Sequence, residues 1–479
     1  MRLFLIFDNH GAEVADIVRG LKKNSHEVLY WVGAPNREVQ NFPEIIFHHY
    51  KDARLGIAPQ RVDSAKYEPP ERELVRKLYH AESMVMMIMN KIFPDLPFEE
   101  RKHLYLELLR YWHGVLTEFQ PDAIIFPLTP HSNYNYLIYE LGKLMGIKTI
   151  MFSDTWISDR TFIHSDLWDV GPKLREVMKA NSGRQFTIDD LNPDVRSYYL
   201  KQKGQNINEA RPWYFTLYRQ QYSGFNMITH KLKILAKNIF SPDFFRVIYD
   251  FFANRLGSNV WKEYRQFQVR PDYQRKYVFV PLQYQPERST TPHGDIYADL
   301  IFAIETIAAA LPEGWIAYVK EHPVQWWRHG RAYSPFRYPG YYEKIARIPN
   351  VFLVPTELGS YELIEHSQAV ATVTGTPGWE AVLRGKPAVM LGYYWYRDCP
   401  YVFTADDVDS CRRAFETIKN NFQVREPDVI NFLKSFDEAT IRCYVDDLLN
   451  TMKVKVTELT SEQRINNLIK SVVSELHAQ

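Results

Sequence analysis

The chain has 479 residues, of which 46% are apolar and 24% charged, and its formal net charge is +1. Such a length exceeds that of an ordinary single domain and predicts two or three domains, each able to bury a core. The near-neutral charge excludes a global field that would attract nucleic acid. Three cysteines, odd in number and spaced like neither a disulfide framework nor a metal site, indicate a reducing cytoplasm.

The opening stretch MRLFLIFDNHG holds an apolar run too short for a signal peptide, and no window has the apolar length that a bilayer-spanning helix needs. We therefore expect a buried first strand and no integral membrane segment. The next periodic segments are helices over 14–23, 71–92, 99–119 and 133–146 and strands over 26–32, 122–128 and 148–154. Strands alternating with helices imply a parallel sheet, so residues 1–165 should form one Rossmann-like lobe.

A second alternation begins at KYVFVPL and continues through the helix of YADLIFAIETIAAAL to the strands in WIAYVKEHP, VFLVP, AVATV and PAVMLG. It predicts a second Rossmann-like lobe over 275–420, followed by helices over 421–479. The fold class expected for the chain is therefore α/β, with two Rossmann-like lobes facing a central cleft and a helical insert over 166–274 between them.

The insert is basic and aromatic. Residues 199–270 contain twelve Lys or Arg and four Asp or Glu, a local net charge of +8, interleaved with WYFTLY and FFRVIYDFF. Such a segment can lie on an anionic membrane surface or near a lipid-linked substrate. Aromatic helices that pack into the core between the lobes would give the same pattern, so both interpretations stay open.

The segment TGTPGWE follows the strand AVATV, at the edge of the sheet where doubly wound folds bind ligands. Pro377 suits the first turn of a helix, so we expect Thr376 to be its N-cap and the turn Thr374-Gly375-Thr376 to bind an anion. Glu380 lies one residue too late for a capping box. It can accept hydrogen bonds from ribose hydroxyls, or it can be a helix-start carboxylate stabilised by the dipole.

Two further strand ends carry polar residues. Alternation places Lys320 and His322 of YVKEHP on one side of their strand, where they could neutralise a leaving phosphate, with His322 donating a hydrogen bond or a proton. The loop PLQYQPERSTT adds donors and acceptors, with Gln285, Glu287 and Arg288 as candidates for donor binding, although a solvated turn would have a similar composition.

In the first lobe, Asp154 of MFSDTWISDR stands just beyond an apolar strand. A carboxylate there can be a general base for an acceptor hydroxyl or a nucleophile for an anomeric carbon. Three residues of other first-lobe strand ends, His10, His131 and Asn133, are candidates for holding the acceptor. No metal site is expected, because no convincing Asp-x-Asp metal pair stands at a predicted strand end.

Together PLQYQPERSTTP, YVKEHP and TGTPGWEAVLRGKP resemble bacterial capsule polysaccharide biosynthesis proteins, a group that includes retaining β-Kdo transferases. The resemblance covers 275–400 and, more loosely, 120–160. It implies a metal-independent glycosyltransferase of the GT-B type with a CMP-activated sugar acid as donor. It also implies that His322 and the turn 374–376 hold the donor phosphate and that Glu380 holds the ribose.

These relatives carry an acidic-acidic-glycine motif where this chain has Ser153-Asp154-Thr155, so only the central Asp matches. The equivalent Asp is a nucleophile in the retaining Kdo enzymes and a base in sialyltransferase-like enzymes, and the nucleophile is the role we expect here. The departure leaves the acceptor, the sugar acid and the stereochemistry open.

The sequence thus predicts a glycosyltransferase of surface polysaccharide synthesis that transfers a Kdo-like or nonulosonic acid, with retention, from a CMP donor to a glycan or glycolipid. It would use no cofactor, bind no nucleic acid, and work in the cytoplasm, with 199–270 as a possible contact to the inner face of the membrane. The alternatives are a teichoic-acid-type transferase using a CDP-polyol and a non-catalytic capsule-assembly scaffold.

Overall fold

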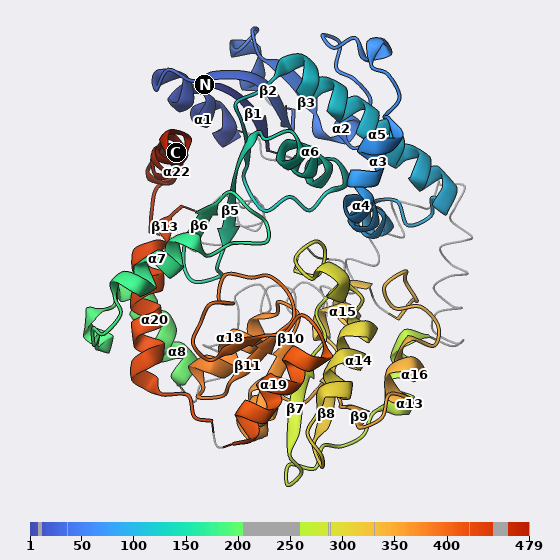
Figure 1. Ribbon diagram of the computed structural model, residues 1–479, viewed down its shortest axis with the longest axis vertical. Coiled ribbons are helices and arrows are strands. Elements are labelled where there is room, and N and C mark those ends of the chain that lie inside the picture. The colour runs from blue at the N-terminus through green and yellow to red at the C-terminus, as the bar shows by residue number, and fades with distance from the viewer. Residues whose placement is uncertain are drawn as a thin grey trace, which may run out of the picture. The chain divides into compact units, whose positions relative to one another are not determined.

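The computed structural model describes residues 1–7, 12–35, 37–204, 259–285, 287, 289–329, 331–420, 422–443 and 458–478. They form two compact units (Figure 1). Unit 1 comprises Met1–Arg184 and Leu433–Gln479, and unit 2 comprises Gln185–Phe432. Most of the basic insert, 205–258, lies outside the described residues, so the two interpretations of that segment stay predictions.

Unit 1 is built on a seven-stranded sheet in the order β13-β6-β5-β4-β1-β2-β3. Its strands are β1 (Arg2–Ile6), β2 (Glu27–Gly33), β3 (Ile46–His49), β4 (Ala123–Phe126), β5 (Lys148–Asp154), β6 (Arg160–His164) and β13 (Ile441–Arg442). The first five are parallel, and β6 and β13 are antiparallel additions. The chain runs outward from β1 to β3 and then returns to β4 on the other side of β1, as in a Rossmann fold.

Helices cover both faces of this sheet. They are α1 (Ala12–Lys23), α2 (Tyr50–Ala53), α3 (Arg72–Lys77), α4 (Tyr79–Ile92), α5 (Phe98–Phe119), α6 (Asn133–Leu144), α7 (Pro172–Ala180) and α22 (Ser461–His477). Successive strand residues point to opposite faces, so Phe4 and Ile6 pack on α4, α5 and α6, whereas Leu3 and Leu5 pack on α1 and α22. The helix α22 crosses α1 at Gly20, where a Cβ would come within 2.2 Å of Ile469.

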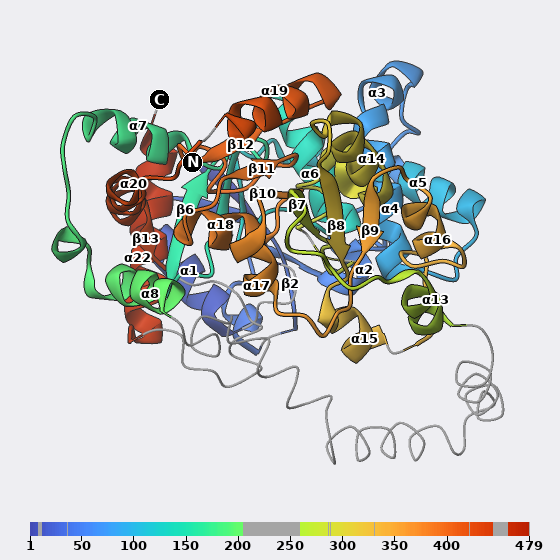
Figure 2. The same cartoon turned by 90° about the horizontal axis from the view of Figure 1, so that it is seen from below.

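Unit 2 is built on six parallel strands in the order β12-β11-β10-β7-β8-β9, seen side by side in Figure 2. They are β7 (Tyr277–Pro281), β8 (Ile316–Lys320), β9 (Val351–Leu353), β10 (Ala369–Thr372), β11 (Ala388–Met390) and β12 (Val402–Thr404). This is again the Rossmann order: strands are added on one side of β7 as far as β9 and then, from β10, on its other side. The two expected α/β sheets are therefore confirmed.

The helices of unit 2 are α8 (Pro193–Lys203), α13 (Val260–Phe267), α14 (Leu300–Ala310), α15 (Pro323–His329), α16 (Tyr341–Ala346), α17 (Ser360–His366), α18 (Thr376–Leu383), α19 (Val408–Lys419) and α20 (Glu426–Ala439), the last of which continues into unit 1. Val278 and Val280 of β7 pack with α14, α16 and α19 on one face. Tyr277 and Phe279 pack with α17 and α18 on the other. The sheet is thus covered on both sides, and its strand ends are left to form a site.

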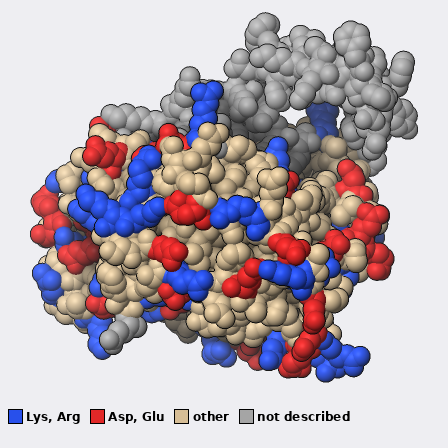
Figure 3. All heavy atoms as spheres, turned by 90° about the horizontal axis from the view of Figure 1, so that it is seen from above, with Lys and Arg blue, Asp and Glu red and all other residues tan. Residues whose placement is uncertain are grey.

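Charge is mixed over the surface. On the face shown in Figure 3, Lys and Arg side chains alternate with Asp and Glu side chains, in keeping with the net charge of +1. Among the described residues, no helix combines the length and the hydropathy that crossing a bilayer requires.

Candidate functional site

The candidate site of unit 2 lies at the carboxyl ends of β7, β8 and β10. In the sheet, β7 lies between β8 and β10, because the chain crosses over before β10. The loops after β7 and β10 flank the point where the strand order reverses. Open α/β sheets bind their ligands at such a point.

The polar groups of the turn after β10 are mostly hydrogen-bonded to other parts of the protein. Helix α18 begins at Thr376 with Gly375 as its N-cap, so the prediction that Thr376 is the N-cap is wrong by one residue. The Thr374 hydroxyl donates to the carbonyl of Ser289, and the Gly375 N–H donates to the Thr372 hydroxyl at 3.0 Å. The Gly375 carbonyl accepts a hydrogen bond from the Tyr396 hydroxyl. The turn is therefore formed before any ligand arrives.

A side chain from the neighbouring loop completes this turn. Gln283, which is only 7% exposed, directs its amide oxygen at the turn, because in that orientation both ends of the amide are satisfied. The oxygen accepts from the N–H groups of Thr374 at 2.8 Å and Gly375 at 3.0 Å and from the Thr372 hydroxyl at 3.1 Å. The two N–H groups that were expected to bind a phosphate thus already have an acceptor.

Glu380 lies one turn further along α18, not in the first turn as expected, and it is 7% exposed. Burial raises its pKa to about 7, opposed by the positive charges of Arg384 and Lys320 and by a hydrogen bond with Thr376. Glu380 therefore sits beneath Thr376 with its proton only loosely held near neutral pH. A carboxyl in this state can either accept hydrogen bonds or exchange a proton.

His322 immediately precedes helix α15, and the backbone N–H of Val324 donates to its Nδ1 at 3.3 Å. A backbone N–H can only donate, so Nδ1 is the acceptor and Nε2 carries the hydrogen. Burial lowers the pKa of His322 to about 4, and the nearby Lys320 and Arg337 lower it further while Glu321 opposes them. His322 is thus neutral near pH 7 and offers an N–H donor from Nε2.

Lys320 is buried and donates to the carbonyl of Leu358 at 2.6 Å and to the hydroxyl of Ser360 at 2.9 Å. Its ammonium group is held by these two partners, while its charge acts on Glu380. The geometry favours an electrostatic contribution of Lys320 over a direct contact with a phosphate.

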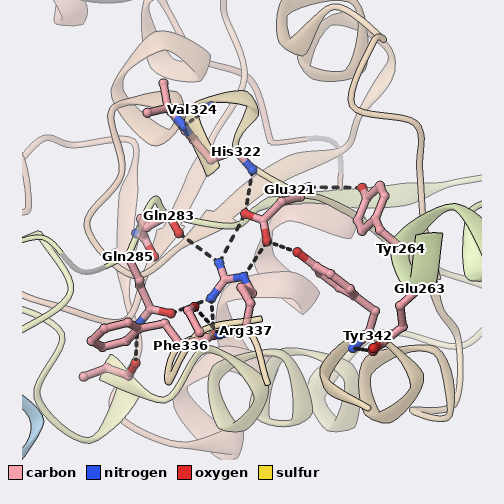
Figure 4. A network of polar contacts seen from close by, with 12 residues as sticks. Glu263, Tyr264, Gln283, Gln285, Glu321, His322, Val324, Phe336, Arg337 and Tyr342 are labelled. Atoms are coloured by element: carbon pink, nitrogen blue, oxygen red, sulfur yellow. Dashed lines mark hydrogen bonds and ion pairs between the residues drawn. The ribbon is translucent and has the colours of Figure 1, made fainter. Parts of the chain in front are cut away.

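A buried ion pair joins the ends of β7 and β8 (Figure 4). Arg337 donates to Glu321 from Nε at 2.5 Å and from a terminal nitrogen at 3.2 Å, and both side chains are fully buried. Glu321 also accepts from the Tyr342 hydroxyl at 2.6 Å and from the backbone N–H of His322 at 2.7 Å. Arg337 further donates to the backbone carbonyl of Gln283 at 3.2 Å. The pair therefore fixes both strand ends.

The other residues of the loop after β7 that were predicted to bind the sugar donor differ in their placement. Gln285 is buried, with its oxygen accepting from Arg337 at 2.7 Å and its nitrogen donating to the Ala298 carbonyl at 3.0 Å. Both ends of its amide are therefore held within the protein. Glu287 is exposed and its carbonyl accepts from Thr290, and Arg288 lies outside the described residues.

In unit 1, Asp154 ends β5 and is 3% exposed. It opens a tight hairpin to β6 in which Trp156 and Ser158 adopt left-handed φ values of 61° and 53°. Such conformations are costly for residues with a side chain and occur where the surroundings fix them, often at functional sites. The neighbouring carboxylate Asp159 is buried and ion-paired with Arg442 at 3.0 Å, which leaves Asp154 as the better candidate.

A buried chain of hydroxyls and an imidazole lies beside Asp154. The Nδ1 of His164 is 2.8 Å from the carbonyl of Asp166, which can only accept, so Nε2 accepts from the Ser153 hydroxyl at 2.8 Å. Thr129 lies 3.0 Å from that hydroxyl. Burial lowers the pKa of His164 to about 4, so the chain is neutral. It joins the ends of β4 and β5 one residue before Asp154.

The acceptor candidates lie at the start of α6, after β4. Asn133 is buried and donates to the carbonyl of Arg54 at 2.9 Å, and its Oδ1 has no hydrogen-bond partner among the described residues. His131 is half-buried, with Nδ1 2.8 Å from the Thr129 carbonyl. His10 lies outside the described residues.

Sequence reasoning missed Arg337, and it missed the contacts that Gln283 and Tyr396 make with the turn of the unit 2 site. Gln283 was visible only as one of several polar residues in a loop. Arg337 comes from the segment between α15 and α16, where no periodicity points to a strand end. Within the described residues, no three His, Cys, Asp or Glu side chains gather in a way that could hold a metal ion.

Two Rossmann-like sheets in one chain define the class of the protein as GT-B-like α/β. The model of the family described as "Capsule polysaccharide biosynthesis protein" matches residues 245–399, which include the ends of β7, β8 and β10. The resemblance to capsule polysaccharide biosynthesis proteins is therefore confirmed over that stretch. No curated protein was found to match the chain.

Solved structures that match this chain include an epimerase and a transferase. UDP-GlcNAc 2-epimerase from Methanocaldococcus jannaschii is 11% identical over 91% of this chain and 98% of its own, with a TM-score of 0.26. KpsC from Thermosulfurimonas dismutans, a beta Kdo 2,7 transferase, is 10% identical over 80% of this chain and 95% of its own, with a TM-score of 0.29.

Proposed function

We propose that the protein is a glycosyltransferase of surface polysaccharide synthesis that transfers a Kdo-like or nonulosonic acid from a CMP-activated donor to a glycan or glycolipid. The observation that carries the proposal is that the stretch matching the capsule polysaccharide family contains the preformed polar turn at the strand-order reversal of unit 2. Nucleotide ligands bind at that place in sheets of this order.

The donor phosphate is proposed to bind where hydrogen-bond donors remain. Thr374 and Gly375 are engaged by Gln283, so the first N–H of α18, at Thr376, and the Nε2–H of His322 take over their expected role. The first N–H groups of a helix have no acceptor within it and lie at the positive end of its dipole. Glu380, beneath Thr376, is proposed to accept from the ribose.

Asp154 is proposed as the nucleophile. Its carboxylate attacks the anomeric carbon as the bond from that carbon to the phosphate oxygen breaks, and CMP leaves with the electron pair. Donors at Thr376 and His322 stabilise the charge that develops on CMP. The acceptor hydroxyl then attacks the anomeric carbon as the bond to Asp154 breaks, and its proton passes to water, so that two displacements give overall retention.

Calorimetry with CMP, UDP and GDP tests the donor. We expect CMP to bind best. His322→Ala should lower the affinity for CMP about tenfold or more, because one hydrogen bond to a charged group is lost. Preference for UDP would refute the sugar-acid donor. The matched control is His366→Ala, at the exposed end of α17, which should leave the affinity unchanged.

Mass spectrometry tests the nucleophile. Enzyme incubated with a CMP-sugar acid should carry one sugar adduct, and Asp154→Asn should lack it. Turnover without an adduct would assign Asp154 the role of a base, and phosphorus in the transferred group would identify a polyol-phosphate transferase instead. Binding without turnover on any acceptor would favour the scaffold.

A further inference from the structure

Gln283 occupies the position at which an anion would otherwise meet the turn. Its amide oxygen accepts three hydrogen bonds, from Thr374, Gly375 and Thr372, all within 3.1 Å. The fit is close, since a Cβ on Gly375 would lie 2.9 Å from the Thr372 hydroxyl and 3.4 Å from the Gln283 amide. A ligand oxygen cannot share this place, so a phosphate must bind beside Gln283.

The backbone of Gln283 is held as firmly as its side chain. The N–H of the preceding residue, Leu282, donates to the Lys320 carbonyl at 2.8 Å, and the Gln283 carbonyl accepts from Arg337 at 3.2 Å. Arg337 is itself fixed by the fully buried carboxylate of Glu321. Figure 4 shows Arg337 between Glu321 on one side and Gln283 and Gln285 on the other. One network therefore runs from the end of β8 to the end of β7, and Gln283 extends it to the turn.

We propose that Gln283 is a positioning residue of the donor-phosphate site, which holds the turn in its binding form with a neutral acceptor, and that the Arg337–Glu321 pair keeps Gln283 in place. The inference rests on the proposed function, since it takes the turn to be where the donor phosphate binds.

Neutrality is the specific requirement. A Glu at position 283 has the same shape, and one of its oxygens would accept the same three hydrogen bonds, while the other would replace the amide NH2 donor. It would also add a negative charge next to the bound phosphate, and like charges a few ångströms apart near a protein surface repel strongly. A nucleoside without a phosphate would not experience this repulsion.

The test compares CMP with cytidine by calorimetry at pH 8, using wild type, Gln283→Glu and Gln368→Glu. The control residue Gln368 precedes β10 at the opposite edge of the same sheet. We expect Gln283→Glu to lower the affinity for CMP about tenfold or more and to change the affinity for cytidine less than about twofold. Gln368→Glu should change neither.

The outcomes separate the two proposals. If wild type binds neither CMP nor another nucleoside monophosphate, the proposed function fails. Suppose that wild type binds CMP. If Gln283→Glu lowers the affinities for CMP and cytidine equally, or lowers neither of them, only the role of Gln283 is refuted. Arg337→Lys retains the charge but loses the forked contacts. It should weaken CMP severalfold, and unchanged CMP affinity in a folded Arg337→Lys protein would refute the part assigned to the ion pair.

Discussion

The buried carboxyl of Glu380 makes the stability of unit 2 depend on pH in a way that one substitution should abolish. Glu380 is 7% exposed, and burial raises its pKa from 4.5 to about 7 in the folded protein, against the opposing charges of Arg384 and Lys320. Glu380→Gln replaces it with an amide of the same shape that never ionises. The Thr376 hydroxyl keeps a hydrogen-bond partner in this variant.

The sign follows from proton binding. Between pH 4.5 and 7 the folded protein holds the Glu380 proton more tightly than the unfolded chain does, so the unfolding free energy falls as the pH rises through this window. The full loss, reached above pH 7, is about 3 kcal/mol. Glu380→Gln should therefore be more stable relative to wild type at pH 8 than at pH 4.5, by about that amount.

Thermal unfolding between pH 4.5 and pH 8 measures this difference. For a unit of this size, about 3 kcal/mol corresponds to a relative change in Tm of roughly 6–12 °C. Glu365→Gln, on the exposed side of α17, is the matched control, and its Tm should change with pH as that of wild type does. If the Tm of Glu380→Gln also changes with pH as that of wild type does, Glu380 is ionised throughout, and its burial does not govern its charge.

Three further experiments test buried contacts in the two units. Glu321→Gln leaves Arg337 buried without its carboxylate and should cost about 3–5 kcal/mol by chemical denaturation, whereas Glu321→Gln combined with Arg337→Met should cost less than the single change. Gly378→Ala places a Cβ 2.7 Å from the Tyr396 hydroxyl and should destabilise unit 2 by about 1–3 kcal/mol, with a lower Tm. Arg160→Met breaks the buried pair with Asp437 and should cost about 3–5 kcal/mol, whereas Arg19→Met, in an exposed pair, should cost about 1 kcal/mol or less.

The sheets could be predicted from the sequence because their strands are short, continuously apolar and separated by helices of regular period. In β7 and β10 every residue but Pro281 is buried, so the apolar runs and the strands coincide. The antiparallel strand β13 was not predicted. Its two residues, Ile441 and Arg442, have no period of their own and are a strand only because β6 offers its edge.

The candidate site was predicted in its residue types but not in their partners. Strand-end position led to His322, Glu380 and the hydroxyl turn, because such residues follow apolar runs directly. The sequence could not show that Gln283 takes the N–H groups of the turn, since that contact spans about ninety residues and depends on which strand lies beside β10. Arg337 is a stronger example, because nothing in the motif YVKEHP indicates that Glu321, between Lys320 and His322, is buried and paired with an arginine sixteen residues later.

Buried ion pairs support the candidate residues in both units. Arg337 and Glu321 hold the strand ends beside His322 and Gln283, and Arg160 and Asp437 hold the hairpin that follows Asp154. Such pairs add little net stability, because desolvation of the two charges offsets most of their attraction, but breaking one is costly. Their effect is therefore to confine the strand ends to one geometry. We therefore infer that these two pairs are retained for the positions of the polar residues beside them more than for the stability of the fold.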